Sequence, residues 1–453
     1  MGLRRTPHDD ALFPITHTMA TAASSSVVIN IAIVGCGQIV THHLEAIASL
    51  PFRVVALCDP SAERRAVLDT LVATASQQQQ QHHHPQQFNT LDDLLLDDDN
   101  NNDLLATIGI IFIAVPHDLH ESIALQALQA TTTTYVVLEK PLAPTHDACD
   151  RLVQASHDYN HRLMIAEQSP YWQEIVLARQ LIQEQRAIGD TIVSAAAYYY
   201  ESMRDNITSG SINNNNDDDQ QQKSGGGYLG WRGSVARAGG GIALDGGLHW
   251  IRPLREICGG RIEQVVGVVR THLAPELQME GESLGHALFQ FASAAAPDDE
   301  DDAAAPSSLR QPPGAGPLIA TYSCNMLATA PMAHDTCPYF RITGNQGEIV
   351  VHGDGLFKAN PGAGGLRLYN EEHPMGKEMF PADRKGGFFL GFTGLWERIA
   401  HIIATHDTAA AHETVVRAAD DVRVVLALYK SSRTRQWEST TSTTTSDGGA
   451  QRH

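Results

Sequence analysis

Cysteine is scarce in this chain, with six residues among 453. No two of them form a Cys-x-x-Cys pair, the spacing that many structural zinc sites and redox sites use. The sequence therefore predicts neither a disulfide framework nor a metal site. We expect the six thiols to stay reduced, as they do in cytoplasmic proteins.

Long apolar runs and an excess of basic residues are missing too. No run approaches the roughly 18 residues needed to cross a bilayer, so we expect a soluble protein without a membrane partner. The net charge of −20 disfavours nucleic-acid binding, which needs a basic face. Many of the acidic residues lie in low-complexity tracts near residues 97–103, 217–219 and 298–302. The negative charge therefore indicates solvated insertions and says little about the substrate.

The length predicts two or three domains, and the pattern of elements changes near residue 168. Residues 27–168 alternate apolar strands with helices, as in a doubly wound parallel sheet. Residues 169–438 predict an α+β domain with a large, mostly antiparallel sheet, one face of which is free for a partner subunit. We expect residues 1–26 and 439–453 to be disordered. Low-complexity insertions are expected near residues 76–88, 97–103, 209–226 and 294–316.

The expected elements follow the apolar runs and their periodicity. Strands are expected at residues 27–35, 53–57, 108–115, 135–138, 163–166, 191–200, 262–272, 284–293, 317–326, 338–343 and 347–351. Helices are expected at residues 38–49, 62–75, 91–96, 119–130, 145–160, 171–185 and 412–431, with a further one beginning near Asp245.

A glycine-rich turn, Gly35-Cys36-Gly37-Gln38-Ile39-Val40, joins the first expected strand to the first helix. The first glycine permits a tight turn, and the second lets the backbone approach a pyrophosphate resting on the helix N-terminus. An ordinary strand–helix turn is the alternative. Val40 replaces the third small residue of the dinucleotide motif, and its side chain is expected to push the helix slightly from the strand.

Asp59 ends the second expected strand, 24 residues after Gly35. A carboxylate at this place accepts hydrogen bonds from the adenine ribose and repels a 2′-phosphate, which favours NAD over NADP. Arg64 and Arg65 lie nearby in the sequence and would reverse this preference if they bound the phosphate. Their alternative role is a solvated helix face.

Lys140 follows an apolar run within Glu139-Lys140-Pro141. Ligands bind at the carboxyl ends of strands in open parallel sheets, so a lysine there is a candidate for chemistry. A second motif runs from three glycines, beginning at Gly239, to Asp245 and His249. A helix beginning near Asp245 would place Asp245, His249, Arg252 and Glu256 on one face.

Three of these residues suit the oxidation of an alcohol. His249 can exchange a proton near neutrality, and Asp245 would orient its imidazole or hold a second hydroxyl. Lys140 would stabilise negative charge on the reacting oxygen. Each residue also has a structural alternative. Lys140 would be a surface lysine, His249 a helix histidine whose hydrogen bonds are all made within the protein, and Asp245 a helix N-cap. Arg252 would either pair with Glu256, which we prefer, or bind a substrate carboxylate.

Two aromatic pairs are candidates for the wall of a sugar pocket. Trp231-Arg232 precedes the three glycines, and Tyr171-Trp172 follows Glu167-Gln168. Their alternative place is the hydrophobic core.

Together these segments resemble the Gfo/Idh/MocA family, the glucose–fructose oxidoreductase and inositol dehydrogenase group. The matching residues are Gly35 to Ile39 with His43, Val115-Pro116-His117-Asp118-Leu119-His120, Glu139 to Pro141, and Gly239 to His249. The resemblance runs from about residue 27 to about residue 437, interrupted by the insertions. Val40 departs from the family pattern, as does Arg252, where many relatives carry an acidic residue.

The resemblance implies an N-terminal Rossmann domain that binds NAD or NADP and a C-terminal domain whose sheet forms a homodimer or homotetramer. It implies hydride transfer to or from a sugar, cyclitol, polyol or related diol, and a cis Lys140–Pro141 peptide. An NAD-dependent glycosidase and a non-catalytic nucleotide-binding sensor are the alternatives, and Lys140 and His249 argue against the sensor. The implied cofactor site comprises Gly35, Cys36, Gly37, Gln38, Ile39, Asp59, Val115, Pro116, His117, His120, Glu139, Lys140 and Gln168.

Overall fold

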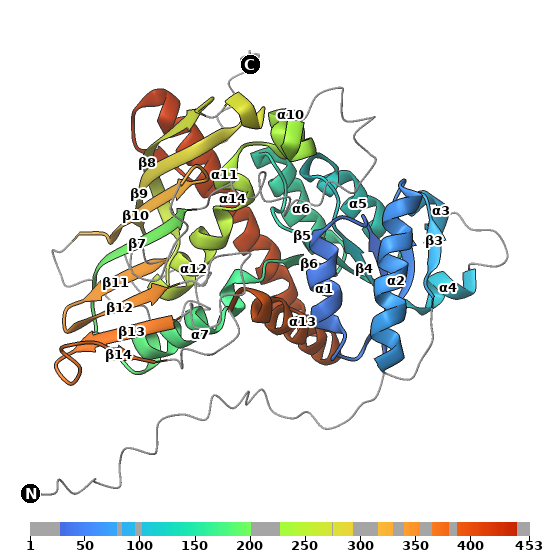
Figure 1. The fold of residues 1–453 in the computed structure, drawn as a ribbon, viewed down its shortest axis with the longest axis horizontal. Coiled ribbons are helices and arrows are strands. Elements are labelled where there is room, and N and C mark those ends of the chain that lie inside the picture. The colour runs from blue at the N-terminus through green and yellow to red at the C-terminus, as the bar shows by residue number, and fades with distance from the viewer. Residues whose placement is uncertain are drawn as a thin grey trace, which may run out of the picture.

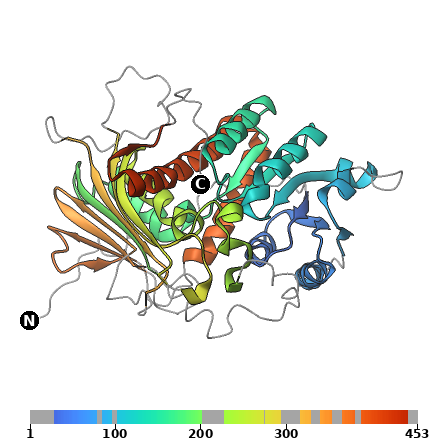
Figure 2. The ribbon, with the colours of Figure 1, turned by 90° about the horizontal axis from the view of Figure 1, so that it is seen from above.

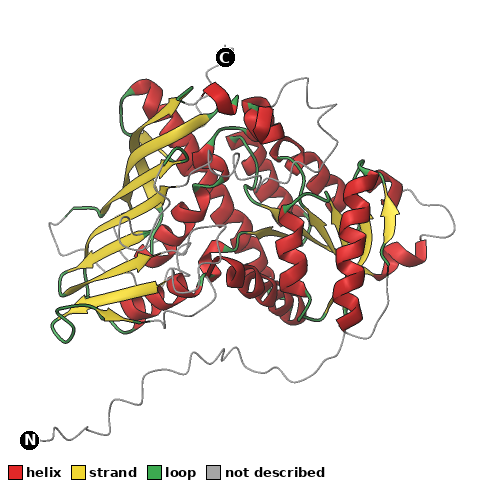
Figure 3. Ribbon diagram, in the orientation of Figure 1, coloured by secondary structure: helices red, strands yellow, loops and turns green. Residues whose placement is uncertain are grey.

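The structure is a computed structural model with two β-sheets and helices packed between them (Figures 1 and 3). It describes residues 28–78, 84–95, 102–200, 227–273, 275–292, 316–328, 339–352, 365–379 and 387–441. The expected leader, the insertion at 209–226 and most of the one at 294–316 lie outside the described residues. Within these ranges, no helix has both the length and the hydropathy needed to span a bilayer.

In the described part of the chain, the first sheet has six strands, all parallel, in the order β3-β2-β1-β4-β5-β6. Its strands are β1 (Ile29–Val34), β2 (Phe52–Cys58), β3 (Gln86–Phe88), β4 (Ile108–Ile113), β5 (Tyr135–Glu139) and β6 (Leu163–Ala166). The central strands are buried on both faces, which explains their continuous β-branched runs. The doubly wound sheet is thus confirmed, and its strand order reverses between β1 and β4, where ligands bind in such folds.

Two elements of this domain lie where low-complexity sequence was expected. Strand β3 pairs with β2 through Gln86 and Phe88, although residues 76–88 were expected to be an insertion. Helix α4 (Asn102–Thr107) likewise begins inside the insertion expected near residues 97–103. Strand β3 is an edge strand, and backbone hydrogen bonds to β2 hold it although its glutamine side chains are exposed.

The other helices described in this domain are α1 (Ile39–Ile47), α2 (Ala62–Gln78), α3 (Leu91–Leu95), η1 (His117–Leu119), α5 (His120–Ala130) and α6 (His146–Asp158).

Among the described residues, the second sheet has nine strands in the order β14-β13-β12-β11-β7-β10-β9-β8-β15. Of the strand pairs described, β7 with β10 alone is parallel, so the expected mostly antiparallel sheet is confirmed. The strands are β7 (Ile192–Tyr200), β8 (Ile262–Thr271), β9 (Glu282–Phe291), β10 (Ile319–Asn325), β11 (Phe340–Gly344), β12 (Gly347–His352), β13 (Gly365–Asn370), β14 (Lys377–Glu378) and β15 (Glu438–Ser439).

Strand β15 lies at the start of the segment that was expected to be a disordered tail. Ser439 pairs with β8, and the Thr440 hydroxyl donates to the Ile262 carbonyl oxygen at 2.8 Å. The ordered chain therefore continues past residue 438.

Two long C-terminal helices, α13 (Gly387–Thr405) and α14 (Thr408–Thr434), connect the two domains. Figure 2 shows α14 between the large sheet and the first domain. Thr414 Oγ1 accepts a hydrogen bond from the Ile165 amide of edge strand β6 at 3.1 Å, and Arg423 pairs with Asp150 of α6. The first domain is therefore held against elements that come last in the sequence, and α13 was not expected at all.

Candidate active site

The glycine turn after β1 fits a dinucleotide. Gly35 has φ +92°, and a Cβ there would overlap the Ala114 carbonyl oxygen after β4, so only glycine fits. A Cβ on Gly37 would meet no heavy atom within 4 Å, which leaves the open space that a pyrophosphate needs. Val40 is fully buried in α1, so the helix accommodates it.

Asp59 lies beside this turn at the end of β2 and is buried. One carboxylate oxygen accepts a hydrogen bond from the Cys36 amide at 2.7 Å, and the other accepts one from the Ser61 amide at 2.8 Å. A carboxylate can accept about four hydrogen bonds, so capacity remains for ribose hydroxyls. Arg65 donates to the Asp59 carbonyl oxygen, so a cation also lies at this edge.

Glu139 and His43 form a buried pair behind the cofactor turn. His43 Nδ1 accepts a hydrogen bond from the Trp396 indole at 2.9 Å, so Nε2 carries the ring proton and donates to Glu139 at 2.7 Å. The second Glu139 oxygen accepts from the Lys140 amide at 3.1 Å. These contacts make Glu139 a support for the end of β5, and its contact with a cofactor stays a prediction.

His120 connects two turns at the carboxyl edge of the sheet. Its ring nitrogens lie 2.7 Å from the Pro141 carbonyl oxygen and 3.0 Å from that of Val115, and the residue is fully buried. Both nitrogens therefore face protein carbonyls, and His120 supports the site without an atom left for a cofactor. The Lys140–Pro141 peptide is cis, as the family resemblance implied.

Lys140 and Asp245 meet across the two domains. The Lys140 ammonium donates to the Asp245 carboxylate at 2.9 Å and to its carbonyl oxygen at 3.0 Å. The other carboxylate oxygen, Oδ2, accepts from Arg232 Nε at 2.9 Å, and His117 Nε2 lies 3.8 Å from Oδ1, the oxygen that binds Lys140. Burial by itself raises the pKa of the Asp245 carboxyl, but Lys140, Arg232 and His117 together hold it well below its usual range.

The three glycines explain how Asp245 reaches Lys140. Cβ atoms on Gly240 and Gly241 would overlap the Tyr429 hydroxyl and the backbone of Glu282, so this loop packs closely on its neighbours. The Glu282 carboxylate accepts from the Gly241 and Ala243 amides, each at 2.9 Å. It thereby caps the short helix α11 (Ile242–Asp245).

The single helix expected from Asp245 onward is wrong. Asp245 ends α11, and after Gly246 and Gly247 the chain begins α12 (Leu248–Cys258), which carries His249. The expected contact between Asp245 and the His249 imidazole is not found among the described residues: the Asp245 oxygens bind Lys140 and Arg232, and His249 Nδ1 contacts Glu167.

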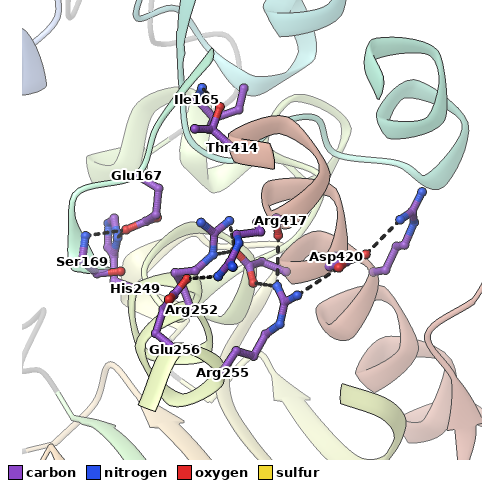
Figure 4. A network of polar contacts seen from close by, with 12 residues as sticks. Ile165, Glu167, Ser169, His249, Arg252, Arg255, Glu256, Thr414, Arg417 and Asp420 are labelled. Atoms are coloured by element: carbon purple, nitrogen blue, oxygen red, sulfur yellow. Dashed lines mark hydrogen bonds and ion pairs between the residues drawn. The ribbon is translucent and has the colours of Figure 1, made fainter. Parts of the chain in front are cut away.

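Glu167 is the partner of His249, and sequence reasoning missed it. Glu167 Oε1 lies 2.9 Å from His249 Nδ1 and also accepts from the Ser169 amide at 2.8 Å (Figure 4). Burial by itself raises the pKa of the Glu167 carboxyl, but His249 and then Arg252 overcome this effect and lower it to about 2. The signal was present, because Glu167 directly follows β6, the neighbour of the strand that carries Lys140.

Arg252 lies beside the Glu167–His249 pair, and its expected ion pair with Glu256 is not found among the described residues. Its guanidinium pairs instead with Asp421 of α14 at 2.6 Å. Glu256 pairs with Arg417 (Figure 4) and also with Arg179. Arg252 lies three residues after His249 on α12, on nearly the same face of the helix, and Asp421 holds its guanidinium there. Binding of a substrate carboxylate by Arg252 stays a prediction.

The remaining expected residues divide between the site and the core. The Trp231 ring packs edge-on against His117 at 4.5 Å, and the Arg232 guanidinium lies 4.4 Å over the Trp231 ring, so both belong to the Asp245 cluster. Trp172 is buried and packs on Trp250, so it has the place in the hydrophobic core that was its alternative. The Gln168 side-chain oxygen is buried and lacks a hydrogen-bond partner among the described residues. It could therefore accept a hydrogen bond from a bound ligand.

Comparisons with known proteins agree with this architecture. Residues 29–167 match the family model described as an oxidoreductase family with an NAD-binding Rossmann fold, and residues 176–350 match the GFO/IDH/MocA C-terminal domain. A search of curated proteins found no match.

Solved structures share the fold at low sequence identity. One is an aldose-aldose oxidoreductase from Caulobacter crescentus, with a TM-score of 0.61 and 18% identity over 91% of this chain and 99% of that one. A second is an oxidoreductase from Agrobacterium radiobacter in complex with NAD+, L-tartaric acid and magnesium, with a TM-score of 0.64 and 13% identity over 91% and 98%.

A third is the WlbA dehydrogenase from Bordetella pertussis in complex with NADH and UDP-GlcNAcA, with a TM-score of 0.59 and 18% identity over 91% of this chain and 98% of that one. At these identities the likeness concerns the fold. The matches to both family models assign the two domains in order, and the chain therefore belongs to the Gfo/Idh/MocA family of oxidoreductases.

Proposed function

We propose that this protein is an NAD(P)-dependent dehydrogenase or reductase that acts on a CH–OH group of a sugar, cyclitol or related diol. The observation that carries the proposal is the Lys140 ammonium, fixed by Asp245 at the carboxyl edge of the sheet that bears the glycine turn. Sugar-acting and NADH-bound relatives of the same fold support this substrate class.

The cofactor would be held by the turn from Gly35 to Ile39 and by Asp59. When bound, nicotinamide supplies the acceptor or donor of a hydride. Lys140 uses two of its three N–H groups on Asp245, so the third is available to the reacting oxygen, where it stabilises negative charge. His249 exchanges the hydroxyl proton.

The substrate class is tested by incubating the protein with sugars, cyclitols and other polyols in the presence of NAD or NADP. Reduced cofactor should accumulate, as seen by its absorbance, with at least one of these compounds. An aryl glycoside that releases its leaving group while NAD is required but not consumed would instead establish the glycosidase alternative. Absence of turnover with every compound and both cofactors contradicts the proposal.

We propose NAD as the preferred cofactor, because the Asp59 carboxylate would meet a 2′-phosphate with like charge. Asp59→Asn keeps an acceptor for the Cys36 amide and removes the charge. We expect the ratio of kcat/KM for NAD over NADP to fall by about tenfold or more, since a loss of roughly 1.4 kcal/mol is a tenfold change.

The matched control for this substitution is Glu63→Gln, which removes one charge from the first turn of α2. Its cofactor ratio should stay within about twofold of the original. An unchanged ratio in Asp59→Asn would remove Asp59 from ribose recognition, and Arg65 would then be the residue to replace.

We also propose that the face of the large sheet opposite α14 joins two copies of the chain. Leu288 and Ile319 are 40% and 38% exposed on adjacent strands β9 and β10, and Val268 is exposed on β8. Leu288→Arg should lower the molecular mass measured by sedimentation, because burying a charge in an apolar contact is costly. Val67→Arg, at an exposed site on α2, should leave the mass unchanged. A monomeric original protein contradicts this interface.

A further inference from the structure

We propose that Glu167 is a positioning residue that fixes the tautomer and orientation of His249, so that Nε2 of His249 is the atom that accepts the substrate proton. This inference rests on the proposed function for the identity of the reaction. The pairing itself can be tested on the protein without cofactor or substrate.

The geometry of the pair is specific. His249 Nδ1 lies 2.9 Å from Glu167 Oε1, and the two residues are only 8% and 5% exposed. The Ser169 amide donates to the same carboxylate oxygen at 2.8 Å, which holds Glu167 in place. Nε2 of His249 has no hydrogen-bond partner among the described residues. The pair thus has one engaged nitrogen and one that is available.

The charge on Glu167 decides which nitrogen carries the proton. Its pKa lies near 2, so the carboxylate is ionised at neutral pH and can only accept hydrogen bonds. Nδ1 must therefore be the protonated nitrogen of the neutral imidazole, and Nε2 holds the lone pair. The adjacent carboxylate then stabilises the imidazolium that forms when Nε2 takes up a proton.

The other charged groups near the pair are already committed. Arg252, which also faces Glu167, is locked to Asp421 at 2.6 Å. Asp245 binds Lys140 and Arg232, whereas His249 Nδ1 contacts Glu167. The site therefore uses one carboxylate for the lysine at the reacting oxygen and another for the histidine.

The reaction step balances with this assignment. In the oxidative direction the substrate O–H bond breaks and an N–H bond forms at His249 Nε2. The C–H electron pair leaves as hydride to the oxidised nicotinamide of the proposed function, and the C=O double bond forms. Glu167 stays ionised throughout and gains no proton.

Glu167→Gln is the discriminating variant, because glutamine has nearly the same size and no charge. Its amide nitrogen can donate to Nδ1, which favours the opposite tautomer with the proton on Nε2. We expect kcat to fall by about 10²–10⁴-fold, since the wrong tautomer of a catalytic histidine has an effect of this order. KM and the cofactor Kd should change by no more than a few fold.

Glu256→Gln is the matched control. It removes a mostly buried carboxylate from the same helix as His249, but its partners are Arg417 and Arg179. This variant should lose stability while kcat and its pH profile stay unchanged. Glu167→Gln should instead alter the acid limb of the pH profile of kcat/KM, which a purely structural role would not do.

A direct readout comes from the ring nitrogens in protein free of cofactor. In ¹⁵N-histidine-labelled protein at neutral pH, the signals that disappear in His249→Asn identify His249. We expect a protonated Nδ1 and an unprotonated Nε2, and loss of this pattern in Glu167→Gln. A proton on Nε2 in the original protein overturns the proposal, even if the variant fails to fold. Failure of the proposed function would appear separately, as absence of turnover with an intact Nδ1–H tautomer.

Discussion

Replacing Lys140 with methionine is expected to lower kcat by about 10²–10³-fold, the usual cost of removing one donor to a developing oxyanion. Methionine keeps an unbranched stem of similar length, so the change removes the charge and its N–H groups and little packing. Asp245 keeps Arg232 as a partner at 2.9 Å, so the loop that carries Asp245 should remain in place. The loss should therefore appear in kcat.

The measurement combines steady-state kinetics on the best polyol with cofactor binding by fluorescence or calorimetry. The cofactor Kd should stay within about threefold, because the glycine turn, and not Lys140, is the proposed pyrophosphate site. Lys430→Met removes an exposed lysine that pairs with Glu438, and it should retain full turnover. Unchanged turnover in Lys140→Met would remove Lys140 from the chemistry and with it the observation that carries the proposed function.

Asp421→Ala is expected to lower the free energy of unfolding by about 3–5 kcal/mol, the usual effect of removing one partner from a buried ion pair. Asp421 binds both Arg252 and Arg255, and all three side chains are buried. Alanine would leave the buried Arg252 guanidinium without its carboxylate partner and Arg255 with Asp420 alone. This network joins α12, which carries His249, to α14, which contacts the first domain.

Denaturant unfolding followed by circular dichroism measures the effect. The matched control is Asp420→Ala on the same helix, where a more exposed carboxylate pairs with Arg255 and Arg423. We expect it to cost about 1 kcal/mol or less, as partly exposed ion pairs usually do. Equal stability losses in the two variants would contradict the view that burial of the Arg252–Asp421 pair sets the cost.

Residues that follow a strand directly were placed correctly by sequence reasoning. Asp59 and Lys140 each end an apolar run, and the carboxyl ends of parallel strands share one edge of the sheet. Glu167 obeys the same rule after β6, so it could have been found. It was missed because the sequence drew attention to the spacing of Asp245 and His249, which assumes one continuous helix.

The contacts of Arg252 and His249 could not be derived from helical spacing. The spacing of Arg252 and Glu256 is that of an ion pair on a helix surface, yet α14 supplies Asp421 and Arg417 from more than 160 positions away. Strand β3 could not be predicted from its sequence either, because backbone pairing at a sheet edge needs no apolar pattern.

The sequence by itself determined most strands of the two sheets, the glycine turn and the edge of the sheet to which Asp59 and Lys140 belong. These features depend on local conformational preferences and on the side-chain periodicity of each element. The tertiary structure alone decided that Asp245 holds Lys140 and that Glu167 holds His249. The physical reason is that each carboxylate pairs with the buried cation or imidazole that folding brings within about 3 Å, and that distance is set by packing between domains.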